Sequence, residues 1–351
     1  MTKSIKLFVS GRLCLFGEHS DWAGGYRRLD PSIEKGYCIS TGTHQGIHAT
    51  CQPHPDKFII TSTMSNNEKV GPLELNMREN DLSLEARKGH FFSYASGVAY
   101  YLVKRFNVGG MVIHNRMNLP AKRGLSSSAA ITVLVVMAFN QLYNLGLSKK
   151  EEMEYAYLGE TITGSECGRM DQVCAFGRIP TFLTLDGDKL EVEELSPQKT
   201  IHMVIVDLKA GKNTKKILSD LNACFPDRGG EIGAQVRYAL GKSNKEILFK
   251  ARQGINEGNS RKVGELMQEA QNIFDEYVKP ASPEELTAPK LHQVLDYPKI
   301  KSLIWGGKGV GSQGDGSAQF VVKGEEEQEK LIKILKANLD VDCFKLNIEA
   351  A

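Results

Sequence analysis

The sequence predicts an α+β protein with two lobes, each built from strands and helices. Its 351 residues exceed the usual size of a single domain. Its composition, with 41% hydrophobic and 25% charged residues, is that of an ordinary globular chain. The spacing of hydrophobic residues changes several times between the period of strands and the period of helices, and it does so in both halves. Mixed elements in both halves indicate two α+β lobes.

Short β-branched and aromatic runs separated by Gly, Asp, Asn and Pro predict strands in the first sixty residues. From about residue 90 the apolar residues recur every three or four positions, which predicts an amphipathic helix ending near Asn107. A long apolar helix to about Leu145 follows a short strand. Ser148, with Glu151 three residues later, predicts the capped start of the next helix, which carries Glu160 near its end. The predicted strands up to residue 195 lie at 5–10, 37–40, 47–51, 58–62, 110–115, 181–185 and 190–195.

The segment at residues 196–200 is the best candidate for a boundary, because it is a short polar stretch containing a proline. We therefore expect an N-terminal domain over residues 1–196 and a C-terminal domain over residues 197–351. The second domain is expected to contain a strand at 202–207, helices between about 230 and 300, a glycine-rich turn at 306–316, a strand at 318–322, a helix at 325–337 and a strand at 343–347.

The charge balance argues against a nucleic-acid partner. Lys and Arg number 44 against 42 Asp and Glu, and no basic stripe stands out. The longest apolar run, residues 129–139, is shorter than the roughly 18 residues of a membrane-spanning helix. The N-terminal residues show no signal-peptide pattern. We therefore expect a cytoplasmic protein that binds neither nucleic acid nor a membrane.

The most informative segment is a glycine followed by consecutive small hydroxyl residues, directly before the long apolar helix. Such a run at a helix N-terminus presents free backbone N–H groups and the positive end of the helix dipole, which is typical of a phosphate site. A serine hydroxyl there can also reach Mg²⁺. The alternative is an ordinary serine N-cap followed by alanines that favour helix. The segment consists of Gly124, Leu125, Ser126, Ser127, Ser128 and Ala129.

Two further segments place acidic side chains beside glycines. Glu160 lies on the helix that precedes Asp171, and these two carboxylates could converge on one metal ion or one hydroxyl. Near the N-terminus, an apolar strand is followed by Glu18, His19 and Asp21 and then by two glycines, a pattern that suits hydrogen bonding to a hydroxyl-rich ligand. The alternatives are two solvated carboxylates in the first case and a surface turn in the second.

Together these segments resemble the GHMP kinases, the superfamily of galactokinase, homoserine kinase, mevalonate kinase and phosphomevalonate kinase. The run from Pro120 to Ala129 is similar to the ATP-phosphate loop of that family. The sequence Gly-Arg-Met-Asp-Gln from Gly168 resembles the galactokinase sequence Gly-Ile-Met-Asp-Gln. The resemblance covers about residues 8–322. Near the N-terminus it falls on the galactokinase signature, at Arg12, Gly17, Glu18, His19, Asp21, Gly24 and Gly25.

The resemblance implies the two-lobed GHMP kinase fold, with a ribosomal-S5-like N-terminal lobe and a ferredoxin-like C-terminal lobe. It implies transfer of the γ-phosphoryl group of ATP to a sugar hydroxyl, the anomeric one in a galactokinase-like enzyme, with Mg²⁺ as cofactor. The expected partners are ATP and a small-molecule sugar, and we expect a monomer or a homodimer.

The resemblance also implies roles for single residues. Residues 124–129 would bind the ATP phosphates, and Ser128 and Glu160 would hold Mg²⁺. Asp171 would take or orient the proton of the attacking hydroxyl. Arg12 would neutralise the transferring phosphoryl group and keep Asp171 ionised. The sugar would be bound by Glu18, His19, Asp21 and Gly168.

Departures from the galactokinase pattern leave the acceptor open. Trp22 and Ala23 stand where galactokinases usually have Tyr and Asn, and the third glycine-rich segment at 306–316 lacks the usual Gly-Gly-x-Gly-Gly. The stretch at 26–30 looks two residues longer and adds Arg27 and Arg28, which would suit the carboxylate of a uronic acid, although solvated loop cations are the other interpretation. The alternatives to a neutral sugar are therefore a uronic acid, or a non-sugar alcohol such as mevalonate or homoserine. A catalytically inactive relative is a further alternative.

Overall fold

The structure is a computed structural model that describes residues 4–119, 127–165 and 167–351. The chain forms two compact units, neither of which is continuous in sequence. Unit 1 comprises Met1–Arg12 and Gly42–Arg178, and unit 2 comprises Leu13–Thr41 and Ile179–Ala351. This division differs from the predicted domains at 1–196 and 197–351, which stay a prediction.

Two long strands account for the discontinuous units. Strands β1 (Ile5–Phe16) and β2 (Gly36–His54) pair with each other, and each contains a point at which the chain passes from one unit to the other. The sequence predicted only the first half of β1, and it predicted β2 as two short strands. The prediction was too short because polar residues at 40–46 interrupt the apolar pattern while the backbone remains extended. Within unit 1, a side chain at Gly46 would overlap the Val9 carbonyl, so glycine permits the close approach there.

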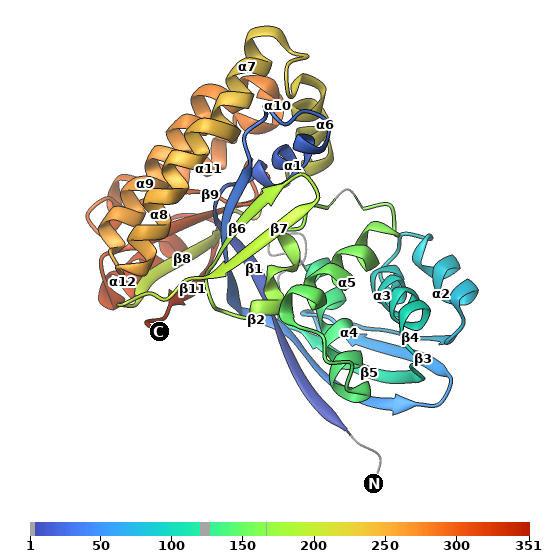
Figure 1. Ribbon diagram of the computed structural model, residues 1–351. Helices are drawn as coiled ribbons and strands as arrows, with labels where there is room; N and C mark the ends of the chain where they lie inside the picture. The colour runs from blue at the N-terminus through green and yellow to red at the C-terminus, as the bar shows by residue number, and fades with distance from the viewer. Residues whose placement is uncertain (1–3, 120–126, 166) are drawn as a thin grey trace. The chain divides into compact units, whose positions relative to one another are not determined.

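The sheet of unit 1 has the strand order β4-β3-β5-β2. Strand β3 pairs in parallel with β5, with Ile60 opposite Ile113, and the other pairs are antiparallel. Helices cover this sheet (Figure 1), and the stacked rings of Phe58 and Phe139, 6.4 Å apart, join strand β3 to helix α4. The elements are β3 (Lys57–Thr63), β4 (Lys69–Asn76), α2 (Glu79–Ala86), α3 (Ser93–Arg105), β5 (Gly110–Met117), α4 (Ser127–Tyr143), α5 (Lys149–Thr161) and the 3₁₀ helix η2 (Asp171–Phe176).

The start of α5 confirms the capping box predicted from the sequence. The Ser148 hydroxyl accepts a hydrogen bond from the Glu151 amide, and the Glu151 carboxylate accepts one from the Ser148 amide. Two orphan N–H groups are thus satisfied, which fixes the first turn of the helix that carries Glu160.

Unit 2 contains a separate four-stranded antiparallel sheet with the order β11-β8-β10-β9. Counted along the chain, these strands and the helices between them form a β-α-β-β-α-β sequence, which is the ferredoxin-like arrangement. The predicted ferredoxin-like lobe is therefore confirmed. The remaining strands of unit 2 pair with the first part of β2. The bounds are β6 (Thr181–Asp186), β7 (Lys189–Glu194), β8 (Ile201–Asp207), β9 (Ile304–Gly309), β10 (Ser317–Val322) and β11 (Asp342–Ile348).

Two apolar cores stabilise unit 2. One lies between the four-stranded sheet and two helices, and includes Phe320, Leu291 and Leu335. The other lies among helices and includes Phe225, Leu221 and Phe274. The bounds are α1 (Ser20–Gly25), η1 (Tyr26–Arg28), α6 (Thr214–Cys224), α7 (Gly230–Tyr238), η3 (Ala239–Ser243), α8 (Asn244–Asn256), α9 (Ser260–Ile273), η4 (Phe274–Val278), η5 (Lys279–Ala281), α10 (Pro283–Leu286), α11 (Pro289–Leu295), η6 (Pro298–Ile300) and α12 (Glu325–Asn338).

The prediction of a turn over 306–316 was wrong at its beginning, because residues 304–309 form strand β9. Glycines are uncommon in strands, but here they allow close packing of helix α9 against β9. A side chain on Gly306 would overlap the carbonyl of Gly264, and one on Gly264 would overlap Trp305. Across the residues that the structure describes, no helix is long and apolar enough to cross a membrane.

Candidate functional site

The structure brings Asp171 and Arg12 into direct contact in unit 1. Asp171 is the first residue of η2, and its side chain is 24% exposed. Arg12 extends from strand β1 with a side chain that is 6% exposed, and its Nη2 donates a hydrogen bond to the Asp171 carboxylate. The two residues are 159 positions apart in sequence. A buried guanidinium beside a carboxylate that still reaches solvent is suited to an anionic reactant.

Glu160 forms a second carboxylate position in the same unit. It is buried near the end of α5, its Oε2 accepts a hydrogen bond of 2.8 Å from Gln172, and it is also hydrogen-bonded to Ser128. Burial, and then the nearby charge of Asp171, raise the pKa of Glu160 to about 7, although the bonds to Ser128 and Gln172 act in the opposite direction. The alternative of two solvated carboxylates is therefore wrong for Glu160.

The predicted phosphate loop is described only in part. Ser127 is the first residue of helix α4, Ser128 is half-buried and Ala129 is buried in the first turn. Gly124, Leu125 and Ser126 lie outside the described residues. The role of this segment in binding phosphate stays a prediction. So does the role of Gly168, which is half-buried in unit 1.

The oxygen atoms around Glu160 fit a Mg²⁺ ion that arrives with ATP. Among the described residues, no group of three or more His, Cys, Asp or Glu side chains could hold a metal ion. Ser128 and Glu160 supply a hydroxyl and a carboxylate, and Mg²⁺ usually combines one or two such ligands with substrate phosphates and water. A divalent cation would also stabilise the charged form of Glu160, which burial and the nearby charge of Asp171 disfavour.

In unit 2, the segment that follows β1 buries its polar side chains. Glu18, His19 and Asp21 are 6%, 5% and 8% exposed, so the surface-turn alternative is wrong. The chain bends sharply here because Gly17 has φ 89° and His19 has φ 68°. A side chain on Gly17 would overlap the Tyr37 carbonyl, so only glycine fits at this position.

A residue that the sequence did not single out, Lys308, meets Glu18. It lies on β9 and is 2% exposed. Its Nζ donates to the Glu18 carboxylate and, at 2.9 Å, to the Gly309 carbonyl. Both residues, with Gln313, line a small cavity of about 40 Å³ within unit 2. The signal available in the sequence was a single lysine inside a glycine-rich run, which by itself resembles an exposed loop cation.

His19 is held in its neutral form. Burial, and then the charges of Lys212 and Lys308, lower its pKa from 6.5 to about 4, opposed by a contact with the Ser312 backbone. The indole Nε1 of Trp22 donates to His19 Nδ1 at 3.1 Å, and the ring of Phe274 stacks on the imidazole. These contacts fix the orientation of the ring as a neutral polar group.

Arg27 and Arg28, the two cations of the stretch at 26–30, each lie near a carboxylate of the protein. Arg27 donates to the Asp186 carboxylate at 2.6 Å and to the carbonyls of Pro31 and Ile33, so its guanidinium stabilises this turn. Arg28 is exposed and lies 3.9 Å from Asp188. These partners support the interpretation of both as structural or solvated cations.

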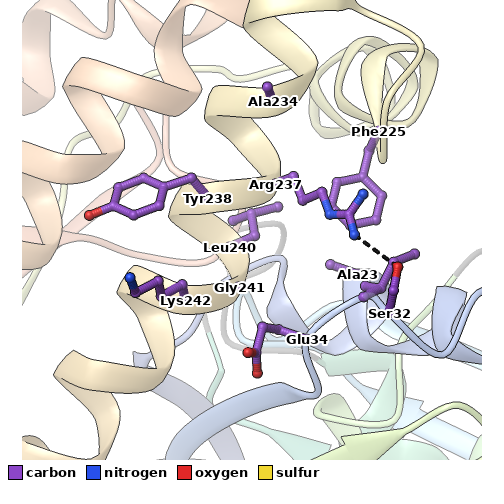
Figure 2. Close-up of a pocket in the computed structure, with 11 residues that line it drawn as sticks. Ala23, Ser32, Glu34, Phe225, Ala234, Arg237, Tyr238, Leu240, Gly241 and Lys242 are labelled. Carbon is purple, nitrogen blue, oxygen red and sulfur yellow. Dashed lines mark hydrogen bonds between the residues drawn. The ribbon is translucent and has the colours of Figure 1, made fainter.

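A larger surface pocket of about 260 Å³ also lies in unit 2 (Figure 2). Phe225, Leu240 and Ala23 contribute apolar surface to it. Arg237 donates to the Ser32 hydroxyl at 3.1 Å, shown by the dashed line in Figure 2. The described residues that line this pocket include none of the predicted site residues. The predicted residues thus form two groups, one in unit 1 around Asp171 and Glu160 and one in unit 2 around Glu18 and His19.

Comparison with known proteins agrees with these features. Residues 93–178 match the family model of the GHMP kinases N terminal domain, a segment that contains Ser128, Glu160 and Asp171. The fold is similar to Lactococcus lactis galactokinase complexed with galactose, with a TM-score of 0.74 and 18% identity over 99% of this chain and 94% of that one. It is also similar to Methanococcus jannaschii mevalonate kinase, with a TM-score of 0.70 and 19% identity over 98% of each chain.

A third similar structure is Streptococcus pneumoniae phosphomevalonate kinase in complex with phosphomevalonate and AMPPNP, with a TM-score of 0.70 and 15% identity over 97% of this chain and 100% of that one. These structures share the two-lobed α+β fold across nearly the full length of the chain. The family match lies on the segment that holds the carboxylates of unit 1. The family match therefore identifies a GHMP kinase N terminal domain over residues 93–178, and the similar structures show that the chain shares the fold of these small-molecule kinases.

Proposed function

We propose that this protein is a sugar kinase that transfers the γ-phosphoryl group of MgATP to the anomeric hydroxyl of a free sugar. In this proposal the group in unit 1 carries out phosphoryl transfer, and the group in unit 2 binds the acceptor. Phosphoryl transfer needs positioning and neutralisation of charge more than covalent participation by the protein. The side chains of unit 1 have the chemistry for both tasks.

Asp171 accepts the proton of the acceptor hydroxyl as its oxygen attacks the γ-phosphorus. The bond from that phosphorus to the bridging oxygen of ADP breaks, and ADP leaves. Arg12, which already donates to Asp171, stabilises the charge on the transferring group. Ser128 and Glu160 would hold the Mg²⁺ of MgATP, which supplies neutralisation of the phosphate charge.

The observation that carries the choice of a sugar is the buried polar segment at Glu18, His19 and Asp21. A buried carboxylate and a neutral imidazole are strong hydrogen-bonding partners for hydroxyl groups, and they discriminate against ligands that lack the matching hydroxyl. Three such groups within four residues suit a polyhydroxylated acceptor better than mevalonate or homoserine.

Release of ADP with a panel of acceptors tests this proposal. The panel contains neutral monosaccharides, the corresponding uronic acids, mevalonate and homoserine, each with MgATP. We expect turnover of at least one monosaccharide and formation of its 1-phosphate. Turnover of mevalonate or homoserine with none of the sugars would refute the proposal.

A uronic acid is the second candidate, and the structure supports it through different cations from those predicted. Arg27 is bound to Asp186 and to backbone carbonyls, whereas Lys212 and Lys308 are the cations that act on His19. Lys308 is paired with Glu18, and Lys212 donates to the Val310 carbonyl, so a carboxylate on the sugar would compete with these partners for the two lysines. Preference for a uronate that survives Arg27→Ala and is lost in Lys308→Met would establish this candidate.

A further inference from the structure

The segment before Asp171 is bound to helix α5 by a second arginine, Arg169. Its Nε and Nη2 donate to the two carboxylate oxygens of Glu154, both at 3.1 Å. Its guanidinium also lies over the ring of Tyr157, 4.3 Å from the centroid. Glu154 and Tyr157 are three residues apart on α5, so they lie on neighbouring positions of one helix face.

The same helix holds the segment on the other side of Asp171. Gln172 donates to Glu160, which lies six residues after Glu154 and hence about 9 Å further along the helix axis. Residues 169–172 therefore run along α5 with both ends bound to it. Asp171, between these two contacts, has Arg12 as its own partner.

We propose that Arg169 is a positioning residue that sets the orientation of Asp171 by binding the segment to α5. This inference rests on the role of Asp171 in the proposed function. A bidentate arginine–carboxylate pair fixes direction as well as distance, and stacking on an aromatic ring restricts the guanidinium further. Gly168 directly precedes Arg169, and glycine leaves the backbone conformationally free, so a contact at Arg169 is needed to define where the segment goes.

The contribution of this pair to stability is expected to be small. The side chains of Arg169 and Glu154 are 20% and 44% exposed, and ion pairs of this exposure usually stabilise a protein little. Catalysis is more sensitive, since displacement of a reacting group by about 1 Å costs on the order of 10²-fold in rate. Loss of rate without loss of stability is thus the signature of positioning.

Unit 2 provides a matched control. Arg252 donates through Nε and Nη2 to Glu193 and lies over the ring of Phe182, 5.3 Å from its centroid. Its side chain and that of Glu193 are 37% and 43% exposed. This pair likewise joins an arginine to a glutamate and an aromatic ring, although both nitrogens donate to the one oxygen Oε1. Neither residue belongs to the groups assigned to catalysis or acceptor binding.

The experiment compares Arg169→Met, Arg169→Lys, Glu154→Gln, the double variant Arg169→Met/Glu154→Gln, and Arg252→Met. Hydrogen exchange of the peptide covering residues 168–177 is measured in each full-length protein without substrate. We expect exchange there to accelerate several-fold in Arg169→Met and Glu154→Gln, and to be unchanged in Arg252→Met. Equal exchange in wild type and Arg169→Met, or equal acceleration in Arg252→Met, would overturn the proposal.

Kinetics with whichever acceptor of the panel is phosphorylated supply the second readout. We expect kcat to fall about 10- to 100-fold in Arg169→Met with less than a threefold change in the KM for ATP. Arg169→Lys keeps the charge but not the bidentate geometry, so it restores only part of the rate. The double variant loses no more than the more severe single variant, because both remove the same link.

Unchanged kcat in Arg169→Met would overturn the proposal even with faster exchange. If wild type phosphorylates no acceptor in the panel, the proposed function fails, and the exchange measurement still decides whether Arg169 orders the segment.

Discussion

Asp171 is the residue on which the proposed chemistry depends most directly. Asp171→Asn keeps the size of the side chain and an acceptor for Arg12 but removes the charge that takes the proton. General base catalysis typically contributes about 10²–10⁴-fold, so we expect kcat to fall within that range while ATP affinity changes little. Steady-state kinetics and ATP titration measure both quantities. Asp188→Asn, at a side chain that is 75% exposed, is the control. A near-normal kcat in Asp171→Asn would show that this carboxylate does not contact the reacting hydroxyl.

His19 makes the stability of the protein depend on pH. Its pKa is about 4 in the folded chain against an ordinary 6.5. Between these values the unfolded chain binds a proton that the folded chain does not, so the free energy of unfolding falls as the pH is lowered through this window. When the pH is lowered from 6.5 to 5, we expect the free energy of unfolding to fall by about 1–2 kcal/mol less in His19→Asn than in wild type.

Asparagine is suited to this test because it tolerates the positive φ of His19 and retains an acceptor for Trp22. Urea unfolding at a series of pH values gives the comparison, with His48→Asn, at an exposed histidine, as the control. If the free energy of unfolding changes with pH in parallel for wild type and His19→Asn, a lowered pKa of His19 is contradicted.

Lys308 and Glu18 should behave as a coupled pair. Removing one member of a buried ion pair leaves an uncompensated charge and typically costs about 3–5 kcal/mol, whereas replacing both members costs much less. We therefore expect Lys308→Met to lower the free energy of unfolding more than Lys308→Met/Glu18→Gln does. Both variants should raise the KM for the acceptor. Denaturant unfolding and kinetics test the two statements separately. A double variant that is less stable than Lys308→Met would show that the pair is not coupled.

At the scale of elements, the contact between α9 and β9 depends on paired glycines. A Cβ on Gly264 would overlap Trp305, and overpacking of this kind costs about 1–3 kcal/mol because backbone has to move. Gly264→Ala should therefore destabilise unit 2 in thermal or urea unfolding. Gly211→Ala is the control, since a Cβ there meets no atom within 4 Å. Equal free energies of unfolding for Gly264→Ala and Gly211→Ala would mean that α9 and β9 move apart at little cost in free energy.

The same contact shows what the sequence could not predict. The helices α3, α5 and α12 and the strands β8, β10 and β11 follow regular hydrophobic periods, and the sequence placed them within a few residues. Strand β9 was missed in part because its glycines are required by a contact with helix α9, which ends about thirty residues earlier in the chain. Strand β4 has no buried face and was not predicted. Helix α6 was also missed, although its buried residues Ile217, Leu221 and Cys224 recur at helical spacing after the Asn213 cap.

The candidate site likewise contains residues that the sequence predicted and residues that it did not. The residues next to Asp171 and Glu18 were found because local motifs carry them. Lys308 pairs with Glu18 across 290 positions, and nothing local in the sequence states that a lysine in a glycine-rich run will be buried. Arg27 and Arg28 were open to two interpretations, and only their partners in the fold distinguish them.

At the scale of the whole molecule, the two units cannot be separated by one cut. A fragment of residues 1–196 contains all of unit 1 but lacks most of unit 2, so Leu13–Phe16 of β1, which are fully buried, lose partners such as Gln319. We expect this fragment to bind a hydrophobic dye and to unfold without a cooperative transition.

A spliced chain, in which a short Gly-Ser linker joins residues 1–12 to 42–178, should unfold cooperatively. Its new junction is short, because Ser10 lies against Gly42 within unit 1. Calorimetry and dye binding distinguish the two chains. Cooperative unfolding of the 1–196 fragment would mean that the compact units do not correspond to folding units.

Because unit 2 consists of two separated segments of the chain, the order of synthesis determines when each unit can fold. Leu13–Thr41 is synthesised early but belongs to unit 2, whose remaining residues begin only at Ile179. At about 5–20 residues per second, the 173 residues of Ile179–Ala351 need about 10–35 s to appear. During that interval unit 1 is complete, while the early strands, including Leu13 and Phe16, have apolar side chains without their final neighbours. Until the last strands of unit 2 have been synthesised, these apolar side chains of β1 therefore stay exposed to solvent.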